Sequence, residues 1–505
     1  MPAEDGQRIR LPEESATMRL AEDVAAALDP GDLVALSGGL GSGKTTFARA
    51  MVRALAGDPT LEVPSPTFPL RIDHQLPRFA VVHADLYRLG SAGELDEIGL
   101  EDVLAEGALI VEWPDRLPPA LADNRLDVSL AIEGAGRSAE IAGGGTWPAR
   151  LDRTFLIRVF LDRAGWAGAI RTPIAGDASS RAYERIARRG PPAAAPQAET
   201  AILMNAPARR PGPPLHDGRS YDAAAHRALD VQPFVAVATA LRAAGVRAPE
   251  IYASDLGAGL LLLEDLGAER IVDVAGAPIL ARYEAAIDLL VAMHCRGWPR
   301  ELPLPDGSRY QVPPYDREAL LVELSLFPDW IGGAGGDPAF PMEKRAEFLA
   351  AWSRLLDRLS PAGTLVMRDF HSPNILWQGA AEGIRRVGVI DFQDALVGNP
   401  AYDVASLAQD ARTAMGEDEE AALTARYIAG RRQADPRFDA EGFKTDYALL
   451  ALQRATKVLG IFTRLALAEG KPGYQRHRAW LKTLIRRNLA HPVLSELRLW
   501  YEPYL

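Results

Sequence analysis

The chain has 505 residues, of which 48% are hydrophobic and 24% are charged. At roughly 150 residues per domain, this length predicts two or three globular domains, and the composition excludes a disordered or collagen-like chain. No apolar run approaches the roughly 20 residues of a membrane span, and no cationic start precedes an apolar signal core, so a cytoplasmic protein without membrane contact is expected. The single cysteine, Cys295, excludes a disulfide framework and zinc sites built on paired cysteines, and we expect it to be a small buried apolar residue.

The net charge of −11 is unevenly distributed. Residues 1–152 hold 25 acidic and 13 basic side chains, whereas the rest of the chain holds 42 acidic and 43 basic ones. Because binding to nucleic acid depends largely on Lys and Arg contacts with phosphates, the acidic first third is a poor direct ligand for RNA. Any role involving RNA is therefore expected to run through a protein partner. Lysine is scarce, and Lys44 is the only lysine before Lys344.

A phosphate-binding loop stands near the start of the chain. A buried strand predicted over residues 32–36 leads into G-x-x-x-x-G-K-T at residues 38–45, and a helix is predicted over residues 46–55. In such a loop the backbone N–H groups and the lysine face phosphates, and the threonine hydroxyl can ligate Mg²⁺. A merely flexible Gly-rich turn is the alternative. The residues expected to bind ATP here are Gly38, Gly41, Gly43, Lys44, Thr45 and Thr46, with Thr45 also a metal ligand.

Acidic residues follow two further predicted strands. Asp85 comes after an apolar strand over residues 79–84, and Glu112, with Trp113 beside it, comes after one over residues 108–111. Acids at the carboxyl ends of parallel strands face the phosphate site, where they can hold Mg²⁺ or orient the attacking water. Each acid taken alone could equally be a solvated turn residue. Thr67, in a polar turn after the first helix, could sense the terminal phosphate.

Several ordered stretches of the first third, taken together, match one family. They are residues 38–46, 63–68, 83–89, 97–102 and 111–117. This set resembles the bacterial TsaE-type ATPase, which implies a small ATPase that acts with TsaB and TsaD partners to make threonylcarbamoyladenosine at position 37 of certain tRNAs. The tRNA would be contacted only indirectly. The roles implied by the resemblance are phosphate and magnesium binding by Lys44 and Thr45, a switch-like Thr67, a magnesium ligand at Asp85, and a catalytic, water-orienting Glu112 next to a nucleotide-binding Trp113.

Glycine-rich segments between residues 132 and 153 favour a turn, a weak final strand or a linker, and they place a domain boundary near Asp152. We therefore predict an α/β P-loop NTPase domain over residues 1–152. An α+β protein-kinase-like domain is predicted over residues 153–505, with a small β-rich lobe over about 153–268 and a large helical lobe over about 269–505. Helical periodicity after Asp403 predicts that aromatic residues there pack in a core.

The second domain carries the catalytic pattern of a phosphotransferase. Asp369, four residues and Asn374 are followed by an apolar strand that ends at Asp391. In this arrangement Asp369 can align an acceptor hydroxyl and take its proton, while Asn374 and Asp391 can hold Mg²⁺ on the phosphates of ATP. Either half of the pattern alone would often arise by chance, but both lie within about 25 residues in the expected strand and loop settings.

The nucleotide side of this second domain is less regular. Two strands are predicted around a small-residue turn that contains Ser179 and Ser180, which could cover phosphates. The strand that normally carries a phosphate-binding lysine has Met204 in that position. An arginine such as Arg181 or Arg185 neutralises the phosphates instead, or magnesium carries more of that task, or the domain is catalytically weak. Adenine would be contacted at a hinge strand, through Glu264 and Leu266.

These segments, with residues 176–183, 368–372, 390–395 and 398–407, resemble the aminoglycoside phosphotransferase superfamily and, within it, AmgK-type kinases. The resemblance implies ATP-dependent phosphorylation of the anomeric hydroxyl of N-acetylmuramate and N-acetylglucosamine in cell-wall recycling. The superfamily usually has His where this chain has Met367, and Asp403 is expected to brace the catalytic loop. Two alternatives stay open: an antibiotic or choline-type kinase, and a pseudokinase that tethers the ATPase.

Overall fold

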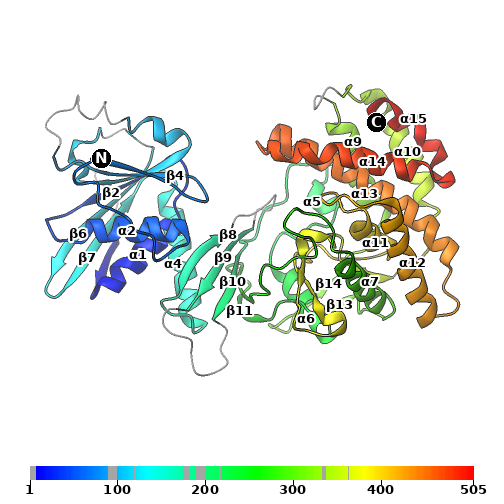
Figure 1. Ribbon diagram of the computed structural model, residues 1–505, viewed down its shortest axis with the longest axis horizontal. Coiled ribbons are helices and arrows are strands. Elements are labelled where there is room, and N and C mark those ends of the chain that lie inside the picture. The colour runs from blue at the N-terminus through cyan, green and yellow to red at the C-terminus, as the bar shows by residue number, and fades with distance from the viewer. Residues whose placement is uncertain are drawn as a thin grey trace. The chain divides into compact units, whose positions relative to one another are not determined.

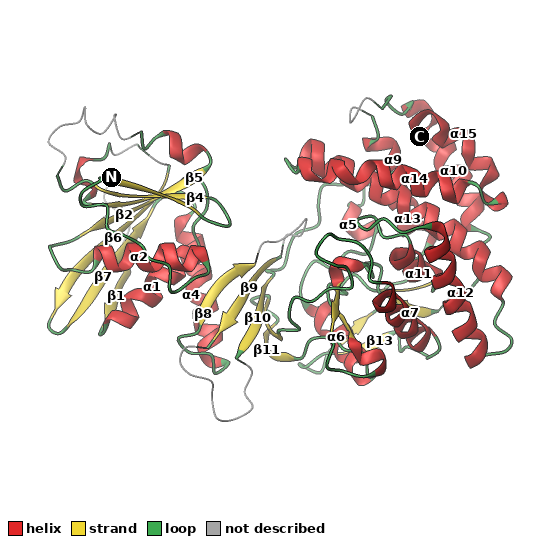
Figure 2. Ribbon diagram, viewed as in Figure 1, coloured by secondary structure: helices red, strands yellow, loops and turns green. Residues whose placement is uncertain are grey.

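The computed structural model describes residues 7–88, 99–118, 121, 123–174, 181–188, 199–214, 218–332, 337–361 and 363–505 (Figure 1). The chain divides into two compact units. The first unit comprises Met1–Ala206, Tyr252–Asp255 and Leu260–Asp265, and the second comprises Pro207–Ile251, Leu256–Gly259 and Leu266–Leu505. Strands dominate the first unit and helices the second (Figure 2).

The first unit begins with a seven-stranded sheet in the order β1-β7-β6-β2-β5-β4-β3, counted over the described residues. The strands are β1 Gln7–Leu11, β2 Asp32–Ser37, β3 Arg71–Gln75, β4 Ala80–Asp85, β5 Gly107–Glu112, β6 Asn124–Glu133 and β7 Gly136–Gly143. The central strands β6, β2, β5 and β4 pair in parallel, while β1, β7 and β3 pair antiparallel. The buried strands predicted for this domain are thereby confirmed, with β2 and β5 running as apolar segments because both of their faces are covered.

Helices α1 (Glu14–Ala26) and α2 (Lys44–Ala56) supply the main core of this sheet. Phe47 and Met51 of α2 and Val24 of α1 are fully buried in one cluster with Val34 and Leu36 of β2. A second cluster on the other side of the sheet contains side chains of β2, β4 and β5. Buried side chains on both faces therefore hold β2, β4 and β5 in place, and with them the carboxyl ends of these strands.

Helix α4 (Trp147–Arg163) runs through residue 152 without a break. The predicted turn and final strand are confirmed as the β6–β7 hairpin, but no linker follows them, because α4 starts at Trp147 and buries that side chain completely. After α4 comes a second sheet, in the order β11-β12-β10-β9-β8. Its strands are β8 Ile170–Ile174, β9 Ala182–Ala187, β10 Thr200–Asn205, β11 Ile251–Asp255 and β12 Leu260–Glu264. The boundary near residue 152 stays a prediction.

The second unit is built around helix α13 (Ala440–Ala468), which is buried along most of its length. The other helices of this unit are α5 Tyr221–Ala224, α6 Gln232–Ala243, α7 Leu280–His294, α8 Arg317–Leu324, α9 Leu326–Trp330, α10 Arg345–Leu356, α11 Ala401–Ala408, α12 Glu417–Ala434, α14 Arg478–Leu489 and α15 Arg498–Tyr501. Its short strands are β13 Glu301–Pro303, β14 Arg309–Gln311, β15 Thr364–Val366, β16 Ile375–Trp377, β17 Val387–Val389 and β18 Leu396–Gly398. Helix α11 packs against α13, and its Asp403 carboxylate accepts from the backbone N–H group of Met367, just after β15.

The aromatic residues predicted to pack in this unit do so. Phe462 and Tyr447 of α13 are buried, and Trp500 stacks on Phe340 with ring centroids 6.3 Å apart. The expectation for Cys295 was wrong, because its side chain is exposed. Cys295 is the C-cap residue of α7, one position beyond the buried face that ends at His294. No helix in the described part of the chain combines the length and apolar character needed to cross a bilayer.

Candidate functional sites

The glycine-rich loop between β2 and α2 forms a tight cradle. Gly38 has a φ of 132°, and a Cβ added to it would lie 2.1 Å from the carbonyl oxygen of Leu130. Gly43, the N-cap of α2, has a φ of 107°, a conformation that side-chain-bearing residues rarely adopt. Gly41 also has a positive φ. The three glycines predicted to bind nucleotide are therefore required by the path of the loop itself, which leads into the first turn of α2.

Lys44 lies inside this loop. Its Nζ donates to the carbonyl oxygens of Gly38 at 2.9 Å and Gly39 at 3.0 Å, and it lies 3.9 Å from the centroid of the Trp113 ring. Burial lowers the pKa of Lys44, and the carboxylates of Glu112 and Asp85 oppose that shift. The ammonium group is thus held at the first turn of α2 by backbone oxygens and by an aromatic face.

Glu112 connects three strands at the end of the sheet. Its Oε2 accepts from Thr45 Oγ1 at 3.0 Å, and its Oε1 lies 3.0 Å from Nε2 of His83. In the strand register Glu112 is the partner of Asp85 on β4 and of Leu36 on β2. The structure therefore brings Thr45, Asp85 and Glu112 to one edge, as the sequence predicted. His83 was missed, and the signal that could have indicated it is a polar side chain inside an apolar strand; it is fully buried.

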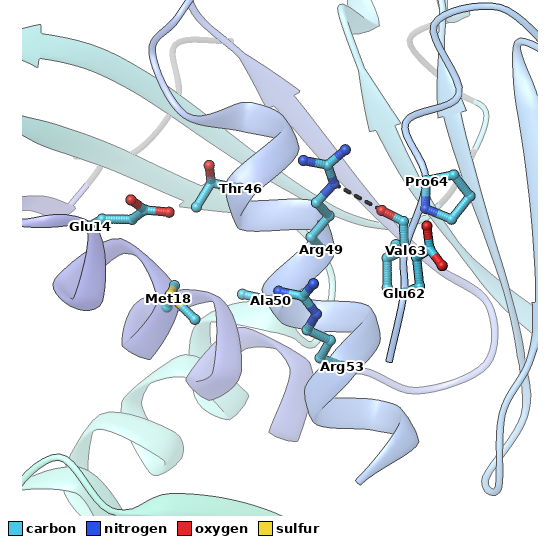
Figure 3. Close-up of a pocket in the computed structure, with 9 residues that line it drawn as sticks. All are labelled: Glu14, Met18, Thr46, Arg49, Ala50, Arg53, Glu62, Val63 and Pro64. Carbon is cyan, nitrogen blue, oxygen red and sulfur yellow. Dashed lines mark hydrogen bonds between the residues drawn. The ribbon is translucent and has the colours of Figure 1, made fainter. Parts of the chain in front are cut away.

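Two other predicted residues lie differently. The Thr67 hydroxyl pairs with Ser65 Oγ at 2.7 Å, so its contacts are within its own turn, and its sensing role stays a prediction. Thr46 lines a cavity of about 330 Å³ between α1, α2 and residues 62–64 (Figure 3). In this cavity Arg49 Nε donates to the carbonyl oxygen of Val63 at 2.9 Å, which ties α2 to the segment that leads into the Thr67 turn.

The donor set fits magnesium together with phosphate. Among the described residues no group of three or more His, Cys, Asp or Glu side chains could hold a metal ion unaided. Mg²⁺ in phosphate sites takes one or two carboxylates or hydroxyls and completes its shell with phosphate oxygens and water. A hydroxyl from Thr45 and carboxylates from Asp85 and Glu112, next to an ammonium group, match that requirement.

The second site lies on the loop after β15. Asp403 of α11 is fully buried, and its carboxylate accepts from the backbone N–H groups of Met367 at 2.7 Å and Arg368 at 3.0 Å. The prediction that Asp403 braces this loop is confirmed. Arg368 has a φ of 68°, so the chain turns sharply just before Asp369. As a result Asp369 is half-buried while its neighbours Arg368 and Phe370 are buried.

Asp369, Asn374 and Asp391 are brought together as the sequence predicted. Asn374 Nδ2 donates to the backbone oxygen of Asp369 at 3.0 Å and to Oδ2 of Asp391 at 3.3 Å. Asp391 has a φ of 59°, and its Oδ1 accepts from Gln393 Nε2 at 2.8 Å. The amide nitrogen of Asn374 is committed to the protein, which leaves its Oδ1 as the oxygen that would join the Asp391 carboxylate on a magnesium ion.

A buried charge cluster, which no sequence pattern indicates, lies beneath this loop. Glu323 of α8 accepts from Arg368 Nε at 3.1 Å, from Lys457 Nζ at 2.7 Å and from the Tyr315 hydroxyl at 2.6 Å. Burial opposes ionisation of Glu323, but the charges of Lys457 and Arg368 outweigh it and lower its pKa to about 2. The conformation of the residue before Asp369 therefore depends on an ionised carboxylate.

His371 follows two residues after Asp369 and is buried. Burial lowers its pKa to about 3, against the attraction of the Asp410 carboxylate, so the imidazole is neutral near pH 7. Asp410 holds the next residue of the loop, because its Oδ2 accepts from the Ser372 N–H at 2.8 Å. The loop is thus fixed on both sides of Asp369 by buried aspartates, Asp403 before it and Asp410 after it.

The nucleotide side of this domain is only partly described. Ser179 and Ser180 lie outside the described residues. Met204 is buried on β10, where it pairs with Tyr183 and Leu261. Arg185 lies on the same sheet face as Met204, because its partner Ile202 is two residues away from Met204, and its Nε donates to Asp265 Oδ2 at 2.9 Å.

The predicted hinge residues are divided between the units. Glu264 ends β12 in the first unit. Leu266 belongs to the second unit, where its backbone oxygen accepts from Gln378 Nε2 at 2.8 Å. Their contact with adenine stays a prediction.

The fold and the two constellations define two classes of protein in one chain: a P-loop NTPase and a protein-kinase-like phosphotransferase. Comparison with known families agrees with both. Residues 11–139 match the family described as threonylcarbamoyl adenosine biosynthesis protein TsaE, and residues 171–440 match the phosphotransferase enzyme family. The chain therefore belongs to the phosphotransferase enzyme family and carries a TsaE-family domain at its N-terminal end.

Curated relatives divide in the same way. An N-acetylmuramate/N-acetylglucosamine kinase of Caulobacter vibrioides is 35% identical over 68% of this chain and 95% of its own length. One of Pseudomonas aeruginosa is 35% identical over 53% of this chain and 76% of its own length. A tRNA threonylcarbamoyladenosine biosynthesis protein TsaE of Rickettsia bellii is 37% identical over 24% of this chain and 82% of its own length. Each relative thus corresponds to one part of this chain.

Proposed function

We propose that this chain is a bifunctional protein. Its N-terminal part is the ATPase subunit for N6-threonylcarbamoyladenosine formation on tRNA, acting with TsaB and TsaD homologues. Its C-terminal part is an ATP-dependent kinase for the anomeric hydroxyl of N-acetylmuramate and N-acetylglucosamine. The observation that carries the kinase proposal is the joint placement of Asp369, Asn374 and Asp391, in a domain whose relatives include kinases named for these two sugars.

In the kinase site, the half-buried Asp369 presents its carboxylate to the acceptor sugar. It aligns the hydroxyl and takes its proton as phosphate is transferred. Asn374 and Asp391 hold magnesium, which neutralises charge on the phosphates of ATP. The buried aspartates Asp403 and Asp410 keep the loop fixed, so little reorganisation accompanies the reaction.

In the P-loop site, Lys44 and the N–H groups of the glycine-rich loop bind the phosphates of ATP. Thr45 and Asp85 hold magnesium, and Glu112 orients the attacking water. The hydrogen bond between Thr45 and Glu112 and the His83 contact support this assignment, because they fix the carboxylate at the start of α2. The strongly acidic charge of this domain supports action through protein partners rather than direct contact with tRNA.

The kinase proposal predicts that N-acetylmuramate or N-acetylglucosamine raises ADP formation by the purified chain above its sugar-independent rate, and that ³¹P NMR detects an anomeric sugar phosphate. Choline, kanamycin and glucose serve as controls, because the first two represent the alternative kinases and glucose lacks the acetamido group. Turnover of choline or kanamycin without turnover of either acetamido sugar would reject the substrate assignment.

A second candidate function rests on Met204. Because no lysine lies between Lys44 and Lys344, the small lobe has no lysine to place on the phosphates. This absence favours a non-catalytic domain that tethers the ATPase. The two candidates differ in one measurement. A catalytic domain transfers phosphate to a sugar at a rate that depends on Asp369, whereas a tether shows no turnover with any acceptor while the P-loop site still binds ATP.

Lys44→Ala is expected to weaken ATP binding at the P-loop by about 10- to 100-fold, because a hydrogen bond to a charged group contributes about 1.5–3 kcal/mol. Sugar phosphorylation should be unchanged, since Asp369 and its loop belong to the other unit. Isothermal titration with a non-hydrolysable ATP analogue measures the first effect and steady-state kinetics the second. Lys344→Ala, at a surface lysine, is the matched control. Full tRNA modification in cells that carry only Lys44→Ala would contradict the role in tRNA.

A further inference from the structure

One face of the five-stranded sheet packs against helices α1 and α4 of the P-loop module, which we define as residues 7–163, within the same compact unit. Arg171 of β8 and Glu184 of β9 share this face, because the strand partner of Arg171 is Ile186, two residues from Glu184. Met204 and Arg185 lie on the opposite face. We call the first the Arg171 face. We propose that the Arg171 face is a docking surface whose partner is the P-loop module, and that nucleotide binding at Lys44 stabilises the sheet through it.

The contact is built on a buried network of two acids and two arginines. Asp23 of α1 accepts from Arg158 Nη2 of α4 at 2.7 Å and from Arg171 Nη1 at 3.0 Å. Arg171 also makes a bidentate pair with Glu184, at 2.6 and 2.8 Å. Arg171 is 2% exposed, Asp23 4% and Glu184 7%. Burial opposes the charge on Arg171, but Glu184 and Asp23 outweigh it and raise its pKa.

Thr154 of α4 completes this network. Its Oγ1 accepts from Arg171 Nη1 at 2.8 Å and donates to the backbone oxygen of Asp23 at 3.2 Å. A bidentate arginine pair demands a defined geometry, and loss of one member leaves another charge buried and unpaired. Helix α1, helix α4 and strands β8 and β9 therefore hold one another in a single arrangement, unlike two domains on a flexible tether.

Helix α2 connects the phosphate site with the Arg171 face through α1, because α2 packs against α1 and α1 carries Asp23. Helix α2 begins at Lys44 and ends before its C-cap Gly57, where an added Cβ would lie 3.2 Å from Thr172 Cγ2 of β8. Thr172 points to the face opposite Arg171, so this second contact reaches β8 itself. The same helix thus has phosphate ligands at its first turn and packs on the sheet at its last. Since helices transmit displacement as rigid elements, ordering of the first turn by nucleotide restrains β8. This step rests on the proposed nucleotide binding at Lys44.

The inference can be tested in the full chain by hydrogen exchange of residues 170–174 and 182–187, with and without a non-hydrolysable ATP analogue and Mg²⁺. Nucleotide is expected to slow exchange there by at least about fivefold, the lower end of ordinary coupling between sites. Lys44→Ala should remove the part of this slowing that nucleotide at the P-loop causes. Any slowing caused by nucleotide in the kinase site should remain, because that site does not depend on Lys44. In Asp23→Asn, the analogue should still bind at Lys44, but this binding should no longer slow hydrogen exchange in residues 170–174 and 182–187.

Two further variants keep the outcome clear. Arg158→Gln removes one arm of the network but leaves Asp23 paired with Arg171, and it replaces Asp23→Asn if that variant does not fold; partial loss of the slowing is expected. Glu133→Gln, in an exposed ion pair of the same module, should behave like the wild type. Equal exchange with and without the analogue, in a chain that binds it at Lys44, overturns the inference. Absence of any Lys44-dependent binding would instead reject the proposed function of the P-loop.

Discussion

Asp369→Asn is expected to lower kcat for sugar phosphorylation by about 10²- to 10⁴-fold, the usual contribution of a general base, with little change in KM for ATP. An amide cannot take the proton of the acceptor hydroxyl. The loop itself should survive, because Asn374 contacts the backbone oxygen of Asp369 rather than its carboxylate. Steady-state kinetics with N-acetylglucosamine as the acceptor measure the effect.

The control for this substitution is Asp306→Asn, which changes an exposed turn carboxylate in the same unit. It should leave kcat unchanged. Equal thermal midpoints for Asp369→Asn and the wild type would show that the loss comes from the reacting group. If kcat of Asp369→Asn lies within threefold of the wild-type value, Asp369 is not the base. If the wild type itself shows no turnover, the non-catalytic tether is the better account.

Both sites could be predicted because their residues are close together in sequence. The P-loop occupies consecutive positions, and Asp369, Asn374 and Asp391 fall within one loop and one hairpin. Local spacing fixes their geometry, so a motif is sufficient. Glu112 and Asp85 needed only the further rule that parallel strands end at one edge, which the β4–β5 register confirms.

The supporting residues could not be predicted, because their partners are distant in the chain. Glu323 lies 45 positions before Arg368, and Lys457 comes from a helix whose periodicity indicates only that one face is buried. A pattern of apolar residues does not say which charged side chain faces which. The same limit applies to Asp23 and Arg171, 148 positions apart, which join the two predicted domains.

Lys457 is one of the few lysines of the chain, and its position shows what it does in the second unit. The sequence drew attention to Lys44 and to Met204, where a phosphate-binding lysine was expected. Lys457 is buried beneath the catalytic loop, but its Nζ is 2.7 Å from Glu323 Oε1 and 3.2 Å from the Tyr402 hydroxyl. Burial opposes its charge, yet Glu323 raises its pKa. Lys457 therefore supports the loop.

Glu323→Ala is expected to destabilise the second unit by about 3–5 kcal/mol, because it leaves Arg368 and Lys457 buried without their counter-charge. Glu301→Ala, which removes one side of an exposed ion pair with Arg309, should cost less than about 0.5 kcal/mol. Urea unfolding followed by circular dichroism compares the two. Equal effects of both substitutions would mean that the cluster under the loop contributes no more than a surface pair.

The pH dependence isolates the charge of Glu323 from its packing. Its pKa falls from 4.5 to about 2 in the folded chain, so its ionised form stabilises the fold fully above about pH 4.5. That contribution, about 3 kcal/mol at 1.36 kcal/mol per pKa unit, is lost as the pH falls toward 2. In Glu323→Gln this part of the acid sensitivity should be missing, so the stability gap between wild type and variant narrows between pH 5 and pH 3. A gap that stays constant over this range would show that Glu323 holds Arg368 by shape and hydrogen bonding alone, because only a group that titrates differently in the folded and unfolded chain can make stability depend on pH.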